Sequence, residues 1–268
     1  MTKSKFLITG TSSGLGRYLA EKCEAISFRR TDPLETARHK DTFYDCIVHC
    51  ATDARNNITS DELPAYYQSH IELTEQLVQI PHRLFVFISS SAVYPDPFRL
   101  NAESDTIALP HDPPLYGLYG LFKLLAEKIV SLKARSSLIL RCVTIVGPTS
   151  RSTNMMRILR NEPVPLTLSP DSSFNIISMD QIKGFIELAV AQNITGIFNA
   201  GSTQNATLKE IAQAVGNRPT FGNFPYNVHQ MNTDKIRRIS KDFDKNTLEI
   251  AKIEAEKMKV FSKKNITC

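Results

Sequence analysis

Short apolar runs alternate with amphipathic segments along the first half of the chain. The runs are rich in β-branched residues and predict buried strands at residues 5–9, 25–28, 45–50, 84–88 and 138–146. Between them, apolar residues recur at helical spacing and predict helices over residues 14–23, 61–79 and 116–134. Such alternation predicts an α/β fold built on a doubly wound parallel sheet.

The pattern changes after Gly147 and Pro148. Segments become shorter, and the spacing predicts helices over residues 152–160, 180–191, 207–215 and 247–261, with a strand over 196–199. We therefore expect a Rossmann-type domain over residues 1–148 and a small mixed substrate-binding lobe over residues 149–268. Residues 95–115 contain five prolines and form a loop long enough to be a functional flap.

The net charge is concentrated near the C-terminus. The 268 residues include 32 Lys or Arg and 27 Asp or Glu, a formal charge of +5 that on its own suggests a polyanionic partner. Residues 231–268 hold 10 of the basic and 6 of the acidic residues, so the rest of the chain is nearly neutral. The segment from Asn246 to Phe261 reads as an amphipathic helix with a charged outer face, and no nucleic-acid partner is expected.

Membrane and metal chemistry are not predicted. No apolar run approaches the roughly 18 residues of a membrane span. The charged start, Met1–Lys5, leads into an apolar run too short for a signal peptide. The five cysteines show no metal-ligand spacing. We expect a cytoplasmic protein with reduced thiols, no metal site and no membrane partner.

A glycine-rich loop, Thr9–Gly16, joins the first predicted strand to the first helix. Glycine lets the backbone approach a pyrophosphate, and the N–H groups and dipole of a helix N-terminus attract it. A strand before and a helix after the loop are typical of a dinucleotide-binding unit, and no Gly-Lys-Ser/Thr follows to suggest a Walker loop. The predicted cofactor contacts here are Gly10, Ser12, Ser13, Gly14, Leu15 and Gly16.

The end of the second strand bears on the choice between NADP(H) and NAD(H). An acidic residue there would bind the ribose 2′-hydroxyl of NAD, whereas this chain has Arg29 and Arg30, with Asp32 two residues further on. Two guanidinium groups suit a 2′-phosphate. NADP(H) is favoured and NAD(H) stays possible; the alternative for the arginines is that one or both are solvated surface charges.

Tyr119 and Lys123 lie four residues apart on a predicted helix and so share one face. A neighbouring ammonium favours the phenolate of a tyrosine and suits it to acid–base work. Ser90 and Ser91 close the fourth strand, and the carboxyl ends of parallel strands face the ligand crevice. We predict Ser90, Tyr119 and Lys123 as the catalytic residues, with Tyr119 and Lys123 also at the cofactor and Ser91 as the alternate serine.

Several segments resemble the extended, epimerase/dehydratase-like branch of the short-chain dehydrogenase/reductase superfamily. They are Ile47–Ala51, Ser90–Tyr94, Tyr119–Glu127, Leu138–Pro148, Ile177–Asp180 and Ile197–Gly201, so the resemblance covers nearly the whole chain. It implies that Cys50, Ala51 and Thr52 line the cofactor and that Lys123 binds its ribose. His49, on the third strand, is more typical of a satisfied core histidine than of a catalyst.

Departures from that branch narrow the expected chemistry. The glycine loop has the G-x-x-x-G-x-G spacing of the superfamily's single-domain enzymes. Ser91 and Ala92 stand where dehydratases carry Asp-Glu, so dehydration is not expected. Ser173 replaces the arginine that grips a nucleotide diphosphate in some epimerases. Arg151, Arg157 or Arg160 are alternative sources of that charge, and the other reading is that they are solvated residues of a surface helix. The predicted substrate contacts are Ser91, Thr144, which replaces a family Asn, and Arg151.

The resemblance implies an NAD(P)-dependent oxidoreductase that reduces a keto-sugar or nucleotide-linked sugar with NADPH by a Ser-Tyr-Lys mechanism. A nucleotide-sugar epimerase with tightly bound NAD(P) is the first alternative. A non-catalytic dinucleotide sensor or RNA-binding relative is the second, and Ser90, Tyr119 and Lys123 argue against it. The expected partner is a small sugar substrate, and a homodimer through the helices that flank the sheet is typical of the family.

Overall fold

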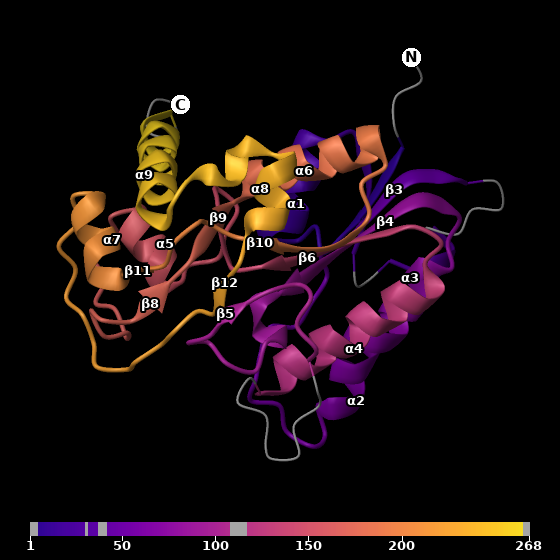
Figure 1. Ribbon diagram of the computed structural model, residues 1–268, viewed down its shortest axis with the longest axis horizontal. Coiled ribbons are helices and arrows are strands. Elements are labelled where there is room, and N and C mark those ends of the chain that lie inside the picture. Colours follow the sequence, from indigo (N-terminus) through magenta and orange to yellow (C-terminus); the bar gives the residue numbers. More distant parts are fainter. Residues whose placement is uncertain (1–4, 30–31, 37–41, 108–116, 265–268) are drawn as a thin grey trace.

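A six-stranded parallel sheet lies at the centre of the molecule (Figure 1). The computed structural model describes residues 5–29, 32–36, 42–107 and 117–264. The strands run in the order β10-β6-β4-β3-β1-β2, with bounds β1 Phe6–Thr9, β2 Ala25–Phe28, β3 Tyr44–His49, β4 His82–Ser90, β6 Ser137–Cys142 and β10 Gly196–Ala200. Order and direction confirm the predicted doubly wound α/β fold.

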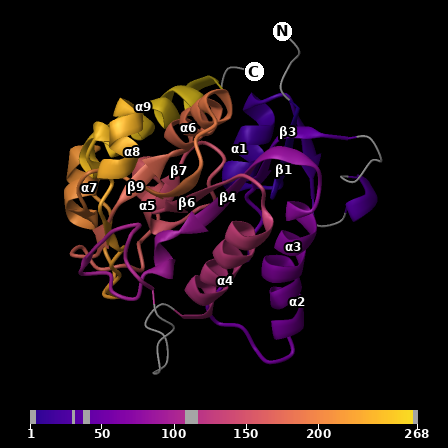
Figure 2. The ribbon, with the colours of Figure 1, turned by 45° about the vertical axis from the view of Figure 1, so that its right-hand side comes forward.

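Helices cover both faces of this sheet (Figure 2). Leu7 and Ile8 are neighbours on β1 and belong to two different apolar clusters, because successive strand residues point to opposite faces. Helices α1 (Gly14–Lys22) and α6 (Met179–Gln192) pack on the Ile8 side. Helices α2 (Leu63–Tyr67), α3 (Leu73–Val78) and α4 (Gly117–Lys133) pack on the Leu7 side.

The segment predicted as one helix over residues 61–79 contains a π-helical turn. The turn, Gln68–Glu72, separates α2 from α3. Buried positions are Tyr66 before the turn and His70 and Ile71 within it, while Tyr67, which the helical spacing placed inside, is 44% exposed. A π-turn adds one residue to the repeat and therefore shifts the buried face.

The predicted strand over residues 138–146 is wrong as a single element. β6 ends at Cys142, and β7 (Thr144–Val146) leaves the central sheet to pair with β9 (Ile176–Ser178). The break falls at Val143, whose N–H still donates to Ala200, while the next N–H, that of Thr144, donates to Asn175. Here the chain passes from the sheet into the C-terminal part.

The C-terminal part packs small elements around the carboxyl edge of the sheet. They are α5 Asn154–Leu159, β8 Ser173–Phe174, β11 Ala206–Thr207, α7 Leu208–Ala214, β12 Gln230–Met231, which pairs with β5 Leu100–Asn101, α8 Asp234–Ile239 and α9 Thr247–Lys264. The β10 strand also comes from this part of the chain, yet it completes the central sheet. The division at residue 148 stays a prediction.

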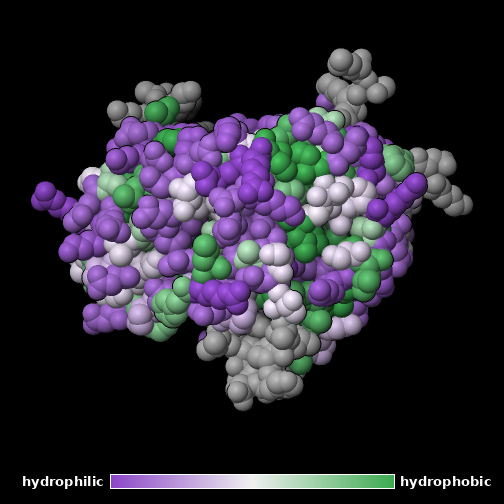
Figure 3. Space-filling model, viewed as in Figure 1, coloured by the Kyte–Doolittle hydropathy of each residue, from purple (hydrophilic) through white to green (hydrophobic). Residues whose placement is uncertain are grey.

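The predicted C-terminal amphipathic helix is present as α9. Ala251, Ala255 and Met258 are buried, whereas Glu249 and Lys252 are exposed. Polar residues cover most of the face shown in Figure 3, with smaller apolar patches between them. Among the described residues, no helix combines the length and the apolar character that a membrane crossing requires.

Candidate active site

The glycine loop has the close backbone contacts of a dinucleotide cradle. Gly10 has φ +71°, and a Cβ there would lie 2.8 Å from the Ala51 nitrogen. A Cβ on Gly16 would lie 2.4 Å from the Gly10 carbonyl oxygen. Gly14, with φ +61°, opens onto space with no atom within 4 Å of the Cβ position. Gly10 and Gly16 have no room for a side chain, and the open space at Gly14 leaves an approach at the start of α1.

A buried hydroxyl without a partner lies in the same loop. Thr11 Oγ1 has no hydrogen-bond partner among the described residues, and neither does Ser150 Oγ of the segment docked on the loop. Buried polar atoms are normally satisfied, so both hydroxyls have bonding capacity left for a polar group at this loop. The residues of the loop therefore fit a dinucleotide. Of the predicted contacts, Ser12 is exposed, Ser13 and Gly14 are half-buried, and Leu15 points into the core.

The segment that follows β7 docks on the glycine loop. The Gly14 N–H donates to the Thr149 carbonyl at 2.9 Å, and the Thr149 hydroxyl donates to the Gly14 carbonyl at 2.7 Å. Arg151 Nε donates to Ser13 Oγ at 3.1 Å. The structure therefore places Arg151, which we predicted at the substrate, beside a predicted cofactor residue.

Arg29 follows β2 and is exposed. Its backbone N–H donates to Asp32 Oδ2 at 2.7 Å, which brings this carboxylate to the end of the strand. The second predicted arginine, Arg30, lies outside the described residues.

Ser90 and Tyr119 meet at the carboxyl edge of the sheet. Ser90 is the last residue of β4, and its Oγ accepts from the Ala92 N–H at 3.1 Å. Burial raises the pKa of Tyr119 to about 12, and the Ser90 hydroxyl limits that rise. The Thr52 hydroxyl also limits the rise in the pKa of Tyr119. The backbone N–H of Tyr119 donates to Asn56 Oδ1 at 3.2 Å, which anchors the start of α4.

Lys123 is a buried ammonium one helical turn from Tyr119. Its Nζ donates to the Ile88 carbonyl at 2.8 Å and lies 4.7 Å from the ring centre of Phe87 and 5.9 Å from that of Tyr119. Burial lowers the pKa of Lys123 to about 8. The structure thus brings Ser90, Tyr119 and Lys123 together, as the sequence predicted.

His49 is a satisfied core histidine. Thr9 Oγ1 accepts from the backbone N–H groups of Cys50 and Ala51, so its proton is available to His49 Nδ1 at 2.8 Å. Nε2 of His49 then donates to Thr74 Oγ1 at 3.0 Å. Burial lowers the pKa of His49 to about 3, so the ring is neutral. These bonds also hold Cys50 and Ala51 against the glycine loop.

Two site residues were missed by the sequence reasoning. His70, 3% exposed in the π-turn, bonds Thr52 Oγ1 through Nε2 at 3.0 Å. Tyr226, from the C-terminal part, is close enough that its charge would raise the pKa of Tyr119. His70 had no recognisable signal because the π-turn moves it inward, and Tyr226 lies in an irregular segment with no motif.

The remaining predicted substrate contacts lie near the same edge. Ser91 is buried at the start of a 3-10 turn, Ser91–Val93, and its carbonyl accepts from the Tyr94 N–H. Thr144 is half-buried at the start of β7, where it bonds Asn175 through its backbone. Their contact with a substrate stays a prediction.

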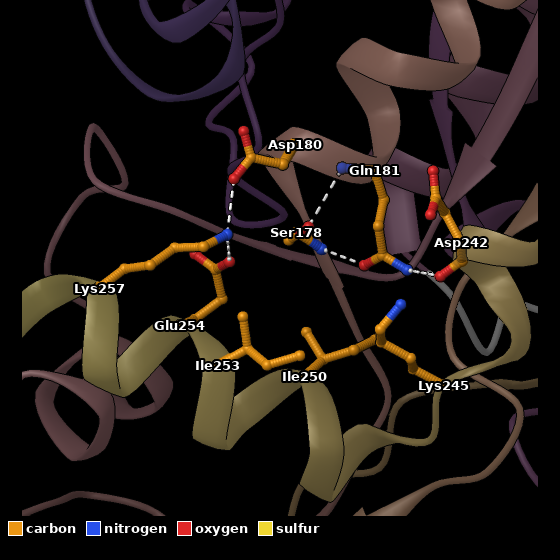
Figure 4. Close-up of a pocket in the computed structure, with 9 residues that line it drawn as sticks. All are labelled: Ser178, Asp180, Gln181, Asp242, Lys245, Ile250, Ile253, Glu254 and Lys257. Carbon is orange, nitrogen blue, oxygen red and sulfur yellow. Dashed lines mark hydrogen bonds and ion pairs between the residues drawn. The ribbon is translucent and has the colours of Figure 1, made fainter.

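A cavity of about 210 Å³ lies elsewhere, between the start of α6 and α9 (Figure 4). Lys257 Nζ bridges Asp180 and Glu254 there, at 2.6 Å from each carboxylate. Gln181 closes a capping box with Ser178. None of the predicted site residues lines this cavity.

The fold, the glycine loop and the Ser90–Tyr119–Lys123 cluster define a dinucleotide-binding enzyme of the Rossmann type. The model of the NAD-dependent epimerase/dehydratase family matches residues 20–163, more than half of the chain. The chain therefore belongs to this family of NAD(P)-dependent enzymes. No match was found among curated protein sequences.

Solved structures share the fold along nearly the whole chain. MoeE5 in complex with UDP-glucose and NAD is 18% identical with a TM-score of 0.75, over 96% of this chain and 99% of its own. A dTDP-4-dehydrorhamnose reductase from Bacillus anthracis, in complex with NADP, is 15% identical with a TM-score of 0.77, over 97% and 99%. A UDP-glucuronic acid 4-epimerase from Bacillus cereus, with UDP-glucuronic acid and NAD, is 18% identical with a TM-score of 0.72, over 96% and 99%.

Proposed function

We propose that the protein reduces a keto-sugar, free or nucleotide-linked, with NADPH. The observation that carries the proposal is the cluster at the carboxyl edge of the sheet. The Ser90 hydroxyl lowers the pKa of Tyr119, against the effect of burial, and the Lys123 ammonium lies 5.9 Å from the Tyr119 ring centre. Carbonyl reduction needs three groups. They are a hydroxyl that positions the carbonyl oxygen, an acid that protonates this oxygen, and a cation that adjusts the pKa of the acid.

Each residue has a distinct task. Ser90 donates a hydrogen bond to the carbonyl oxygen of the substrate, and Tyr119 gives its phenolic proton to that oxygen. Lys123 stabilises the phenolate that remains and binds the cofactor ribose. NADPH, when bound, supplies the hydride to the carbonyl carbon. The glycine loop binds the pyrophosphate, and Tyr226 and Arg151 approach from the lobe.

The direct test is net consumption of NADPH. We expect the purified protein to oxidise NADPH with dTDP-4-dehydrorhamnose, the substrate named by one structural neighbour, at a rate that depends on Tyr119. Tyr119→Phe should abolish turnover while NADPH still binds, because only the transferable proton is lost. Activity in the Tyr119→Phe protein would overturn the catalytic assignment.

The cofactor choice has its own test. Arg29, together with Arg30 of the sequence, supports a 2′-phosphate site, so Arg29→Ala should weaken NADPH far more than NADH. Equal losses for the two cofactors would contradict the preference for NADPH.

Epimerisation with a retained NAD is the second candidate. Asp32 supports it, because its carboxylate lies beside the end of β2, where acidic residues bind the ribose of NAD. The test is stoichiometry with UDP-glucuronic acid and with UDP-glucose, the sugars bound by two neighbours. Conversion to an epimer without net change in NAD would favour this candidate over the reductase.

A further inference from the structure

Helix α4, which carries Tyr119 and Lys123, begins without a capping residue of its own. The first four N–H groups of a helix have no partner inside it, and a Ser, Thr, Asp or Asn just before the helix normally accepts from one of them. The sequence at 113–116 is Pro-Pro-Leu-Tyr, which contains no such residue. Gly117, the first residue of the helix, has no side chain.

Asn56 supplies the missing cap from a different part of the chain. Its Oδ1 accepts from the backbone N–H of Tyr119 at 3.2 Å, across 63 sequence positions. Tyr119 is the third residue of α4, and the third N–H is one of the two that a capping side chain normally binds. The bond therefore does the work of a local cap, and it ends on the residue proposed as the acid.

Gly117 leaves room for the Asn56 amide. It has φ +61°, and a Cβ there would lie 2.9 Å from Asn56 Oδ1 and 3.3 Å from Asn56 Cγ. An alanine at this position would have to displace the amide, besides adopting a backbone conformation that L residues disfavour. The glycine and the asparagine thus belong to one contact.

Ion pairs close the loop that carries Asn56. The guanidinium of Arg55 donates to Asp53 at 2.8 Å and to Glu62 at 2.6 Å. Glu62 also accepts from the backbone N–H and the hydroxyl of Thr59, at 3.2 and 3.0 Å. Residues on both sides of Asn56 therefore bond the same carboxylate, which holds the loop in one shape.

Tyr66 joins this loop to α4. It is 1% exposed, and its hydroxyl donates to the Arg55 carbonyl at 3.0 Å. Its ring meets that of Phe122, three residues after Tyr119 on α4, at 5.0 Å between centres. One buried side chain therefore contacts both the helix and the backbone next to Asn56, and this contact places the Asn56 amide at the start of α4.

We propose that Asn56 is a positioning residue that caps α4 from outside the helix and so holds Tyr119 in place for proton transfer. The inference rests on the proposed function, in which Tyr119 protonates the substrate oxygen. It deepens that proposal, because Tyr119 lies in the first turn of its helix, where helices fray. Lys123 lies one turn further on and is held separately by the Ile88 carbonyl, at 2.8 Å.

The test measures hydrogen exchange at the Tyr119 amide without any substrate. The full chain is labelled with isotopic tyrosine for NMR, and the Tyr119 signal is the one that Tyr119→Phe removes. Asn56→Ala should make this amide exchange about ten-fold faster, because its acceptor is lost. The Tyr18 amide, inside α1, is the reference in the same spectrum. An unchanged exchange rate at Tyr119 would overturn the proposal.

Two companion variants separate capping from other roles of the loop. Asn56→Asp keeps an acceptor oxygen and suits the positive end of the helix dipole, so it should keep the wild-type exchange rate. Exchange as fast as in Asn56→Ala would show that this oxygen is not the cap. Asn57→Ala is the matched control, since Asn57 is exposed and its side chain has no hydrogen bond within the described residues. Equal acceleration in Asn57→Ala would contradict a specific role for Asn56.

A variant of the helix tests the same contact from the other side. Gly117→Ala should displace the Asn56 amide and also accelerate exchange at Tyr119. Combining it with Asn56→Ala should add little to either single effect, because both substitutions remove one bond. Fully additive effects would mean that the two residues act independently, against the proposal.

The variants also report on turnover. With NADPH and dTDP-4-dehydrorhamnose, Asn56→Ala should lower kcat about ten-fold and leave the Kd for NADPH unchanged, whereas Asn56→Asp should retain kcat. A wild-type kcat in Asn56→Ala would overturn the positioning role. Absence of any reduction by the wild-type protein would refute the proposed function, and the amide exchange would still decide whether Asn56 caps α4.

Discussion

Glu127 on α4 and Arg141 on β6 form a bidentate ion pair in the interior. Arg141 Nε and one terminal nitrogen lie 3.0 and 2.7 Å from the two carboxylate oxygens. Ser89 donates to the same carboxylate at 2.5 Å, and Arg141 donates to the Tyr94 hydroxyl at 2.9 Å. The pair thus ties α4, which carries Tyr119, to the strands that end at the candidate active site.

Removing one partner of this pair should be strongly destabilising. Glu127→Ala leaves the Arg141 charge buried without its counter-ion, and we expect a loss of about 3–5 kcal/mol in the free energy of unfolding. Urea denaturation measures it. Glu127→Leu combined with Arg141→Met removes both charges and should cost less than Glu127→Ala alone. A double variant less stable than the single one would contradict this account.

Replacing Lys123 should stabilise the protein while abolishing turnover. Its pKa of about 8 lies below that of an unfolded lysine, so at neutral pH the folded protein bears the full cost of a buried charge. Lys123→Met should raise the free energy of unfolding at pH 7 by about 1–3 kcal/mol. The loss of the hydrogen bond to the Ile88 carbonyl offsets part of this gain.

The sign of the pH dependence checks this prediction. Between pH 8 and about 10.4 the unfolded state holds the proton that folded Lys123 has lost, so wild-type stability gains relative to Lys123→Met. The difference between the two proteins should therefore shrink across that range. A difference that stays constant with pH would show that the Lys123 ammonium is not perturbed.

The three candidate catalytic residues could be selected from the sequence because they follow local rules. Tyr119 and Lys123 share a helix face at a spacing of four, and Ser90 ends a strand whose apolar run is easily recognised. The folded protein keeps the shared helix face and the strand end, because α4 is a regular helix and β4 is a regular buried strand. The same regularity explains why the sheet was predictable.

What the sequence did not reveal depends on irregular backbone and long-range contacts. The π-turn makes Tyr66 the buried tyrosine in place of Tyr67 and brings His70 to Thr52, which a 3.6-residue period does not anticipate. The contact between Arg151 and Ser13 joins residues 138 positions apart. No local pattern encodes such a pairing.

Ser90 and Ser91 should differ sharply in their contribution to catalysis. The Ser90 hydroxyl lowers the pKa of Tyr119, whereas Ser91 is buried in the adjacent turn. Ser90→Ala should lower kcat by roughly 10²-fold, because both the oxygen-positioning donor and the partner of Tyr119 are lost. Ser91→Ala, the matched control, should change kcat much less. Equal losses would make Ser91 a participant in the site.

Alanine substitutions at Gly16 and at Gly14 should differ in their effects on stability and on NADPH binding. A methyl group on Gly16 would meet the Gly10 carbonyl at 2.4 Å, so Gly16→Ala should cost more than about 2 kcal/mol of stability. Gly14→Ala places its methyl in open space and should cost about 1 kcal/mol for its positive φ. Its NADPH affinity should nevertheless fall markedly. Normal binding by Gly14→Ala would place the pyrophosphate elsewhere.

Arg151 should act on the cofactor rather than on the sugar. It reaches the glycine loop from the lobe and bonds Ser13, beside the open approach at Gly14. Arg151→Ala should raise the Kd for NADPH about ten-fold, the effect expected from the loss of one charge-assisted hydrogen bond. NADPH binding should also become less sensitive to salt. With NADPH saturating, the KM for the sugar should change little. The control is Arg157→Ala, which removes a half-buried arginine bonded to Ser152 and Pro165. An altered sugar KM with unchanged NADPH affinity would return Arg151 to the substrate site.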